Sequence, residues 1–222
     1  MISTIIFDFD GVIVDSVDIK AQAFCYLFRE RPQEIRRKIL DLHMNHAGTP
    51  RREKFRIIYK EFLNQAVTDV EIEQLSMEFS QFCVDKIVKV PYIGGAFEFI
   101  SQYHRAYDLF IASSAPESEL RDIVNRRGIG GFFKGVFGTP RTKLEICRAI
   151  LEQKQLLPHQ VAIIGDSISD YDVARQCGTH FIGRIDSSSK DLLSSEPLQI
   201  RLSDLSNLND VLLTQLNGRN PL

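Results

Sequence analysis

Two carboxylates stand two residues apart near the N-terminus, where an apolar run ends in Phe7-Asp8-Phe9-Asp10-Gly11. The run predicts a buried strand, and side chains at positions i and i+2 of a strand project to the same side. Asp8 and Asp10 would therefore repel each other unless the pKa of one is raised or a cation lies between them. Taken alone, the run fits a strand that leads into an Asp-Gly turn equally well.

Three further segments carry groups that could act beside this pair. The strand expected at 107–112 is followed by Ser113 and Ser114, and the strand expected at 161–164 runs into Gly165-Asp166-Ser167-Ile168-Ser169-Asp170. Between them, Lys143 stands near the start of a helix. Ligands of open parallel sheets bind beyond the carboxyl ends of the strands. We therefore expect these acids, a hydroxyl and one lysine to converge on one edge of a sheet.

The first long segment that must position these groups is helical. Its apolar residues recur at three- and four-residue spacing without strand-like alternation. The spacing predicts four helices, at 17–29, 33–44, 51–65 and 68–89. Thr68 and Glu71 form a plausible capping box for the last of them.

After Pro91, short apolar runs alternate with helical patterns. Strands are expected at 107–112, 135–137, 161–164 and 180–182. Helices are expected after Gly94-Gly95 to about 103, and at 117–127, 142–154, 168–177 and 204–215. This alternation predicts an α/β fold, a doubly wound parallel sheet with helices on both faces. Since the first strand, 3–8, belongs with these strands, we expect a core domain of residues 1–15 and 90–222 with an inserted α-helical cap domain, 16–89.

Composition excludes several classes of protein. The 222 residues are 44% hydrophobic with a net charge of -2, which is ordinary for a globular protein and gives no basic surface for nucleic acid. The four cysteines show no zinc-binding spacing and are expected to be reduced thiols. Neither a signal peptide nor a stretch able to span a bilayer is evident. We expect a cytoplasmic protein with no nucleic-acid or membrane partner.

Four features in order resemble the phosphatase branch of the haloacid dehalogenase superfamily. They are DFDGV from Asp8, IASS ending at Ser114, the helix-opening Lys143, and GDSISD from Gly165. Their intervals and the insertion point of the helical segment are also similar to those of the branch with a small helical cap. The resemblance covers essentially the whole chain. It implies a Rossmann-like core and Mg²⁺-dependent hydrolysis of a small phosphorylated metabolite.

The resemblance also implies a role for each group. Asp8 resembles the nucleophile that attacks phosphorus and forms an aspartyl-phosphate. Asp10 resembles the general acid/base, which protonates the leaving oxygen and then activates water. Ser113 resembles the hydroxyl that binds a phosphoryl oxygen, although Ser114 competes for that role. Lys143 and Mg²⁺ would neutralise the charge that otherwise keeps the two anions apart.

The implied metal site consists of oxygen ligands, which Mg²⁺ prefers in octahedral geometry. Asp8, the backbone carbonyl of Asp10, and Asp166 would bind the ion directly. Asp170, four residues further on, would reach the metal directly or orient a water or ligand around it.

Two other activities of the superfamily fit less well. The namesake dehalogenase lacks a metal, so Asp10 with Asp166 and Asp170 argues against it. A phosphonatase forms a Schiff base from a cap lysine. The nearest matching position here is Arg51, which does not deprotonate, and Lys54 lies a turn away.

The beta-phosphoglucomutase branch is the main rival to a phosphatase. That branch usually has a histidine where Lys20 stands, and adjacent acids where Gly165-Asp166 stands. Gly-Asp followed by Asp170 is more typical of phosphoglycolate-phosphatase-like hydrolases. A catalytically silent regulatory or scaffold protein is a remote alternative, because clustered carboxylates without a use would lower stability.

Substrate specificity is expected to lie in the cap loop 46–52. Gly48 and Arg51 are the candidate substrate-binding residues there, with Arg51 able to pair with a carboxylate or second phosphate. The alternative for Arg51 is a first-turn helix residue that faces water. His43 and His46 are expected to be surface or cap residues rather than catalysts. Phosphoglycolate, a sugar phosphate and a nucleotide monophosphate all stay open as substrates, and the oligomeric state is unknown.

Overall fold

The computed structural model describes residues 1–46, 48–185, 198 and 200–216. In this part of the chain, six parallel strands form one sheet in the order β3-β2-β1-β4-β5-β6. The strands are β1 (Thr4–Phe7), β2 (Asp108–Pro116), β3 (Gly135–Thr139), β4 (Val161–Gly165), β5 (His180–Arg184) and β6 (Arg201–Leu202). The order grows outward from β1 in both directions, which is the doubly wound arrangement. The predicted fold class is confirmed.

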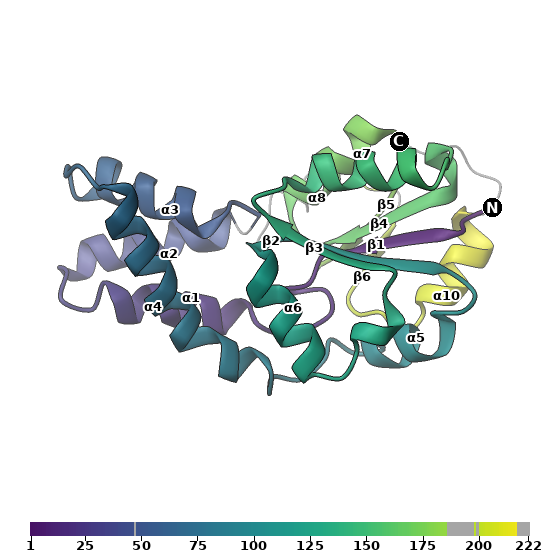
Figure 1. Cartoon of the computed structure of the whole chain (residues 1–222), viewed down its shortest axis with the longest axis horizontal. Helices are drawn as coiled ribbons and strands as arrows, with labels where there is room; N and C mark the ends of the chain where they lie inside the picture. The colour runs from purple at the N-terminus through teal and green to yellow at the C-terminus, as the bar shows by residue number, and fades with distance from the viewer. Residues whose placement is uncertain (47, 186–197, 199, 217–222) are drawn as a thin grey trace.

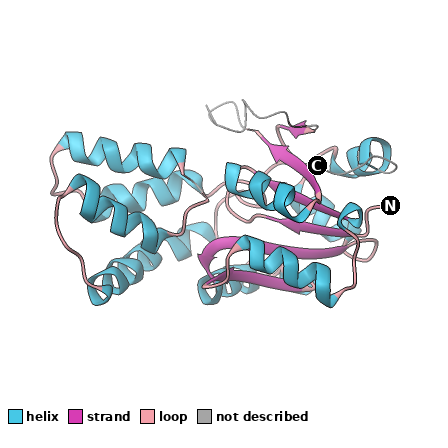
Figure 2. Ribbon diagram, turned by 90° about the horizontal axis from the view of Figure 1, so that it is seen from above, coloured by secondary structure: helices cyan, strands magenta, loops and turns pink. Residues whose placement is uncertain are grey.

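Helices cover both faces of this sheet (Figures 1 and 2). One face carries α7 (Lys143–Gln153) and α8 (Ile168–Cys177), and the other carries α5 (Ala96–Tyr103), α6 (Glu117–Arg126) and α10 (Leu208–Val211). Successive side chains of β1 divide between the two layers, because Ile5 and Phe7 pack with α5 and α6 while Ile6 packs with α7 and α8. Burial on both faces explains why the strands read as continuous apolar runs.

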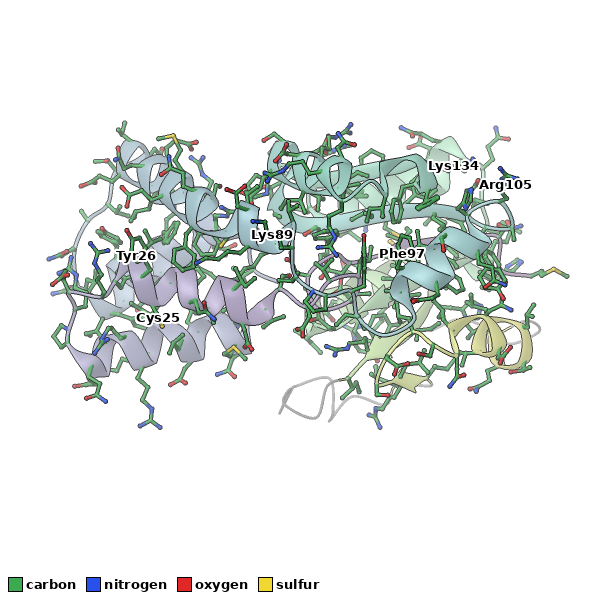
Figure 3. The ribbon with its side chains drawn as sticks, turned by 90° about the horizontal axis from the view of Figure 1, so that it is seen from below. Cys25, Tyr26, Lys89, Phe97, Arg105 and Lys134 are labelled. Atoms are coloured by element: carbon green, nitrogen blue, oxygen red, sulfur yellow. The ribbon has the colours of Figure 1, made fainter. Side chains whose placement is uncertain are left out.

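The helical insertion forms a bundle beyond the carboxyl end of β1 (Figure 1). It contains α1 (Val17–Leu27), α2 (Gln33–Asn45), α3 (Arg51–Ile57), which continues as a π-helix at Ile58–Phe62, and α4 (Asp69–Ile87). Its centre is aromatic, since the Phe24 ring lies 5.6 Å from that of Phe55 and 4.9 Å from that of Phe79. Figure 3 shows Tyr26 in this bundle, Phe97 in the core, and Lys89 between the two parts.

Two parts of the core differ from the sequence-based expectation. β2 runs on to Pro116, so Ser113 and Ser114 lie inside the strand rather than after it, because β3 continues to pair with it as far as Thr139. The last helix begins at Leu208 instead of 204. The Asp204 carboxylate accepts a hydrogen bond from the backbone of Ser206 at 2.9 Å, which holds a turn there. The two-residue strand β6 was not predicted, since it is too short to give a pattern.

Two expectations from composition can be compared with the structure. The four cysteines are free, and Cys83 and Cys147 are buried. Over the described ranges, the structure has no helix with the length and apolar character needed to cross a membrane.

Candidate active site

The central place of β1 brings the predicted groups together. Phe7 pairs with Ile111 of β2 and with Ile164 of β4, so the residues that follow on each strand meet at one edge. A pocket lies there, between the core and the helical bundle. Every sequence-predicted site residue except Asp170 lines it: Asp8, Asp10, Gly48, Arg51, Ser113, Ser114, Lys143 and Asp166.

Lys143 joins two of the carboxylates. A capping box between Thr142 and Glu145 starts α7 at this residue, which aims its side chain at the sheet edge. Its Nζ donates to Asp8 Oδ2 at 2.7 Å and to Asp170 Oδ1 at 2.7 Å. Burial alone would lower the pKa of Lys143, but the two carboxylates outweigh it and raise that pKa. The lysine is therefore a fixed positive charge beside Asp8.

Three carboxylates crowd the same point. One oxygen from each of Asp8, Asp166 and Asp170 lies within 4.8 Å of the others. Burial raises the pKa of Asp8 to about 7 despite Lys143, and Asp170 and Asp10 add to the rise. Burial and the neighbouring Asp8 also raise the pKa of Asp166. Such a set of hard oxygen donors fits Mg²⁺, whose charge would favour the ionised forms of Asp8 and Asp166.

Two glycines make room for this cluster. Gly11 has φ +75°, and a Cβ placed on it would overlap the Oδ2 atom of Asp166. A Cβ on Gly165 would overlap the side chain of Asp170. These glycines were not predicted as site residues, although their places directly after Asp10 and before Asp166 were visible in the sequence.

Asp10 is held apart from this cluster by different partners. The Ser16 hydroxyl donates to its Oδ1 at 2.6 Å, and Lys20 forms an ion pair with its Oδ2. Burial would raise the pKa of Asp10, but Lys20 and Ser16 outweigh burial and the net pKa is lowered. Sequence reasoning noted Lys20 only as a replacement for a histidine and missed Ser16. Their spacing of four residues at the start of α1 brings both to Asp10.

The neighbouring serines face different partners. Ser114 donates its hydroxyl to the carbonyl oxygen of Gly48 at 2.6 Å, which ties β2 to the cap loop. Ser113 is buried, and its Oγ accepts the backbone N–H of Ala115 at 3.2 Å. The Ser113 hydroxyl therefore keeps its proton for an oxygen in the pocket, whereas that of Ser114 is already engaged.

The cap loop lies directly on the core. A Cβ at Gly48 would overlap the hydroxyl of Ser169, so only glycine allows this approach. Ala47, beside it, lies outside the described residues. Arg51 does not face water. Its side chain is buried, and its guanidinium donates to Glu119 Oε1 at 2.5 Å and to Ser80 Oγ at 2.8 Å. The water-facing alternative was wrong, because Glu119, 68 residues away on α6, supplies a buried counter-charge that no local pattern indicates.

Lys54 also differs from the expectation. It was expected a turn away from the site, yet it lines the pocket at 2% exposure. Positions three apart share one side of a helix, so Arg51 and Lys54 of α3 reach the pocket together. Lys54 Nζ lies 3.1 Å from His43 Nδ1. Burial lowers the pKa of Lys54 to about 7 and that of His43 to about 3, so this histidine is neutral.

Comparison with known proteins places this geometry in a family. The haloacid dehalogenase-like hydrolase family matches residues 5–184. A comparison with curated proteins gave no match. Among solved structures, beta-phosphoglucomutase from Clostridium difficile has a TM-score of 0.76 at 17% identity, covering 98% of both chains. A predicted phosphoglycolate phosphatase from Haemophilus somnus has a TM-score of 0.75 at 16% identity, covering 95% of this chain and 97% of its own.

A third structure of the same fold is the HAD hydrolase YfnB from Bacillus subtilis, which was solved bound to magnesium. It has a TM-score of 0.71 at 19% identity and covers 96% of this chain and 99% of its own. The family match covers most of the chain, and the family resemblance of the sequence is confirmed. The protein belongs to the haloacid dehalogenase-like hydrolases.

Proposed function

We propose that this hydrolase cleaves small phosphate monoesters with Mg²⁺ and forms an aspartyl-phosphate on Asp8. The observation that carries the proposal is that two neighbouring carboxylates have different hydrogen-bond and ion-pair partners. Asp8 lies against Lys143 within the acid cluster, whereas Asp10 is held by Ser16 and Lys20. Two carboxyl groups in such different surroundings suit two different tasks.

The metal would be held by carboxylate oxygens of Asp8 and Asp166 and by the backbone carbonyl of Asp10. When bound, Mg²⁺ supplies charge neutralisation and polarises the phosphoryl group. Asp170 has both oxygens hydrogen-bonded, to Lys143 at 2.7 Å and to Ser167 at 2.6 Å. This supports the indirect role for Asp170, in which it positions Lys143 and the surrounding ligands.

The reaction has two displacements at phosphorus. In the first, Asp8 Oδ attacks phosphorus, the P–O bond to the leaving group breaks, and Asp10 gives that oxygen its proton. In the second, Asp10 takes a proton from water as the water oxygen attacks phosphorus and releases Asp8. Ser113 and Lys143 hold the phosphoryl oxygens and their charge.

Lys20 affects the two steps differently. Its ion pair lowers the pKa of Asp10, after the opposing effect of burial, and so favours the ionised form. That form suits the second step, in which Asp10 is the base. For the first step Asp10 must carry a proton, so the Lys20 contact must loosen when substrate binds.

Two rival activities stay testable. A mutase requires a group that holds a distal phosphate, and the expected one, Arg51, is paired with Glu119. A phosphonatase requires an unprotonated cap amine, and the presence of Lys54 in the pocket removes the earlier objection that this lysine lies a turn away. Isomerisation of beta-glucose 1-phosphate with glucose 1,6-bisphosphate would support the mutase. Turnover of phosphonoacetaldehyde with inactivation by borohydride would support the phosphonatase.

The direct test of a phosphatase uses p-nitrophenyl phosphate with and without Mg²⁺. The wild type should release nitrophenol only with the metal, and Asp8→Asn should be inactive. Activity that survives without metal or in Asp8→Asn would overturn the mechanism. No turnover of any phosphate ester by the wild type would favour the silent regulatory or scaffold protein.

A further inference from the structure

The cations of the pocket are unequally partnered. Lys143 is bound by two carboxylates, Lys20 pairs with Asp10, and Arg51 pairs with Glu119. Lys54 differs from them. In the described part of the chain its contacts are the neutral His43 at 3.1 Å and the ring of Phe24 at 5.9 Å, and it forms no ion pair.

The amine of Lys54 is buried, and its environment disfavours the protonated form. Burial and the charge of Lys20 lower the pKa of Lys54 to about 7, and Asp10 offsets only part of this. The groups that face it are Lys20 and Phe24 of α1 and His43 of α2, and the carboxylate that acts on it, Asp10, is already paired with Lys20. A buried ammonium without a partner is unfavourable, so an anion bound beside Lys54 would stabilise its protonated form.

The position of Lys54 indicates where such an anion would come from. Lys54 on α3 of the helical bundle and Asp8 at the end of β1 line the same pocket. A substrate with its phosphoryl group at Asp8 must direct its leaving group toward the bundle side. We infer that Lys54 binds a second anionic group, carried by the leaving group of the substrate; this inference rests on the proposed phosphatase activity. The substrate class is then a small phosphate ester that also carries a carboxylate or a second phosphate.

A series of two-carbon esters tests this inference. Phosphoglycolate, ethyl phosphate and O-phosphoethanolamine share the phosphate and end in an anion, a neutral group and a cation. Glucose 1,6-bisphosphate against glucose 6-phosphate provides the second-phosphate arm. The wild type should prefer the anionic member of at least one arm by about 10- to 100-fold in kcat/KM, which is the range for a hydrogen bond to a charged group.

Lys54→Met should abolish this preference within each arm, because an unbranched apolar side chain of similar length fills the same space without the positive charge. Lys54→Arg should keep part of the preference. The matched control is Lys60→Met, at a lysine of the same bundle whose side chain is 83% exposed, and it should change nothing.

The outcomes separate the two proposals. If the wild type cleaves p-nitrophenyl phosphate with Mg²⁺ but favours the anionic member of neither arm, the role of Lys54 is refuted and the phosphatase stands. A preference that persists in Lys54→Met has the same meaning. If no phosphate ester is cleaved at all, the proposed function itself fails.

Discussion

Replacement of Lys143 by methionine should destabilise the metal-free protein, and more so at alkaline than at acidic pH. The lysine is the positive charge that contacts Asp8 and Asp170, each at 2.7 Å. Without it, the acid cluster of Asp8, Asp166 and Asp170 keeps its mutual repulsion and loses its counter-charge. We therefore expect the variant to fold more weakly wherever these acids are ionised.

The magnitude follows from the geometry. Two carboxylates whose oxygens lie within 4.8 Å repel by about 3.5 kcal/mol at an effective dielectric constant of about 20. Removing one partner of a buried ion pair costs about 3–5 kcal/mol. For a domain of this size, each kcal/mol corresponds to roughly 2–4 °C, so Lys143→Met should lower Tm by about 6–20 °C at pH 8.

The pH dependence has a definite sign. The folded-state pKa of Asp8 is raised above its ordinary value of 3.8 to about 7, and loss of Lys143 would raise it further. The native protein then holds a proton that the unfolded chain has already released, so stability falls as pH rises through this window. At pH 5 Asp8 is largely protonated, and the loss in Lys143→Met should be small.

The assay is thermal and urea unfolding of wild type, Lys143→Met and the exposed-site control Lys60→Met, with EDTA, at pH 5 and pH 8. Mg²⁺ should narrow the gap at pH 8, because the metal replaces the missing positive charge. An equal loss at both pH values would mean that Lys143 acts through packing alone. A loss below about 1 kcal/mol, the level of exposed ion pairs, would refute the coupling of the cluster.

Three further outcomes are expected. Gly11→Ala should raise the Mg²⁺ concentration needed for half-maximal activity by at least about tenfold. The new methyl group would enter the acid cluster, and the left-handed φ of this residue disfavours alanine. A titration of activity with Mg²⁺ checks this, and an unchanged half-saturating Mg²⁺ concentration would contradict it. Glu119→Ala should lower the free energy of unfolding in urea by about 3–5 kcal/mol, because Arg51 is left buried without its ion pair. Loss of the exposed ion pairs of Arg126 should change the free energy of unfolding by less than about 1 kcal/mol. Equal effects would refute the importance of the buried Arg51–Glu119 pair. Saturating Mg²⁺ should raise the Tm of the wild type more at pH 8 than at pH 5, because at pH 5 the raised pKa of Asp8 retains a proton that the metal must displace; an equal rise at both pH values would contradict this.

The sequence was sufficient where the chemistry depends on strand ends. Asp8 and Asp166 follow buried apolar strands, and ligands of an open parallel sheet bind beyond the carboxyl ends of its strands, which was enough to expect these acids at one edge. The sheet then places β1 between β2 and β4, as that prediction needs. Lys143 could be predicted for the same reason, since its helix start has a visible capping box in Thr142 and Glu145.

The sequence was insufficient where side chains meet across the two parts of the chain. The partner of Arg51 is Glu119, which lies on another helix. The periodicity of α3 shows that Arg51 and Lys54 share one side of the helix, but it does not show that this side faces the pocket. Lys20 reaches Asp10 because α1 begins at Val17, a few residues after the strand end, but the sequence did not show which way this first turn faces. Such contacts depend on how the bundle packs on the core, which no local pattern specifies.

The central claim is that Asp8 becomes phosphorylated, and chemical trapping tests it most directly. The enzyme would be quenched during turnover of p-nitrophenyl phosphate with Mg²⁺, reduced with borohydride and digested for peptide mass spectrometry. Reduction converts an aspartyl-phosphate to homoserine, so homoserine should appear at position 8 in the wild type and be absent without Mg²⁺ and in Asp8→Asn. Turnover with an unmodified Asp8, or homoserine at another position, would contradict the proposed mechanism.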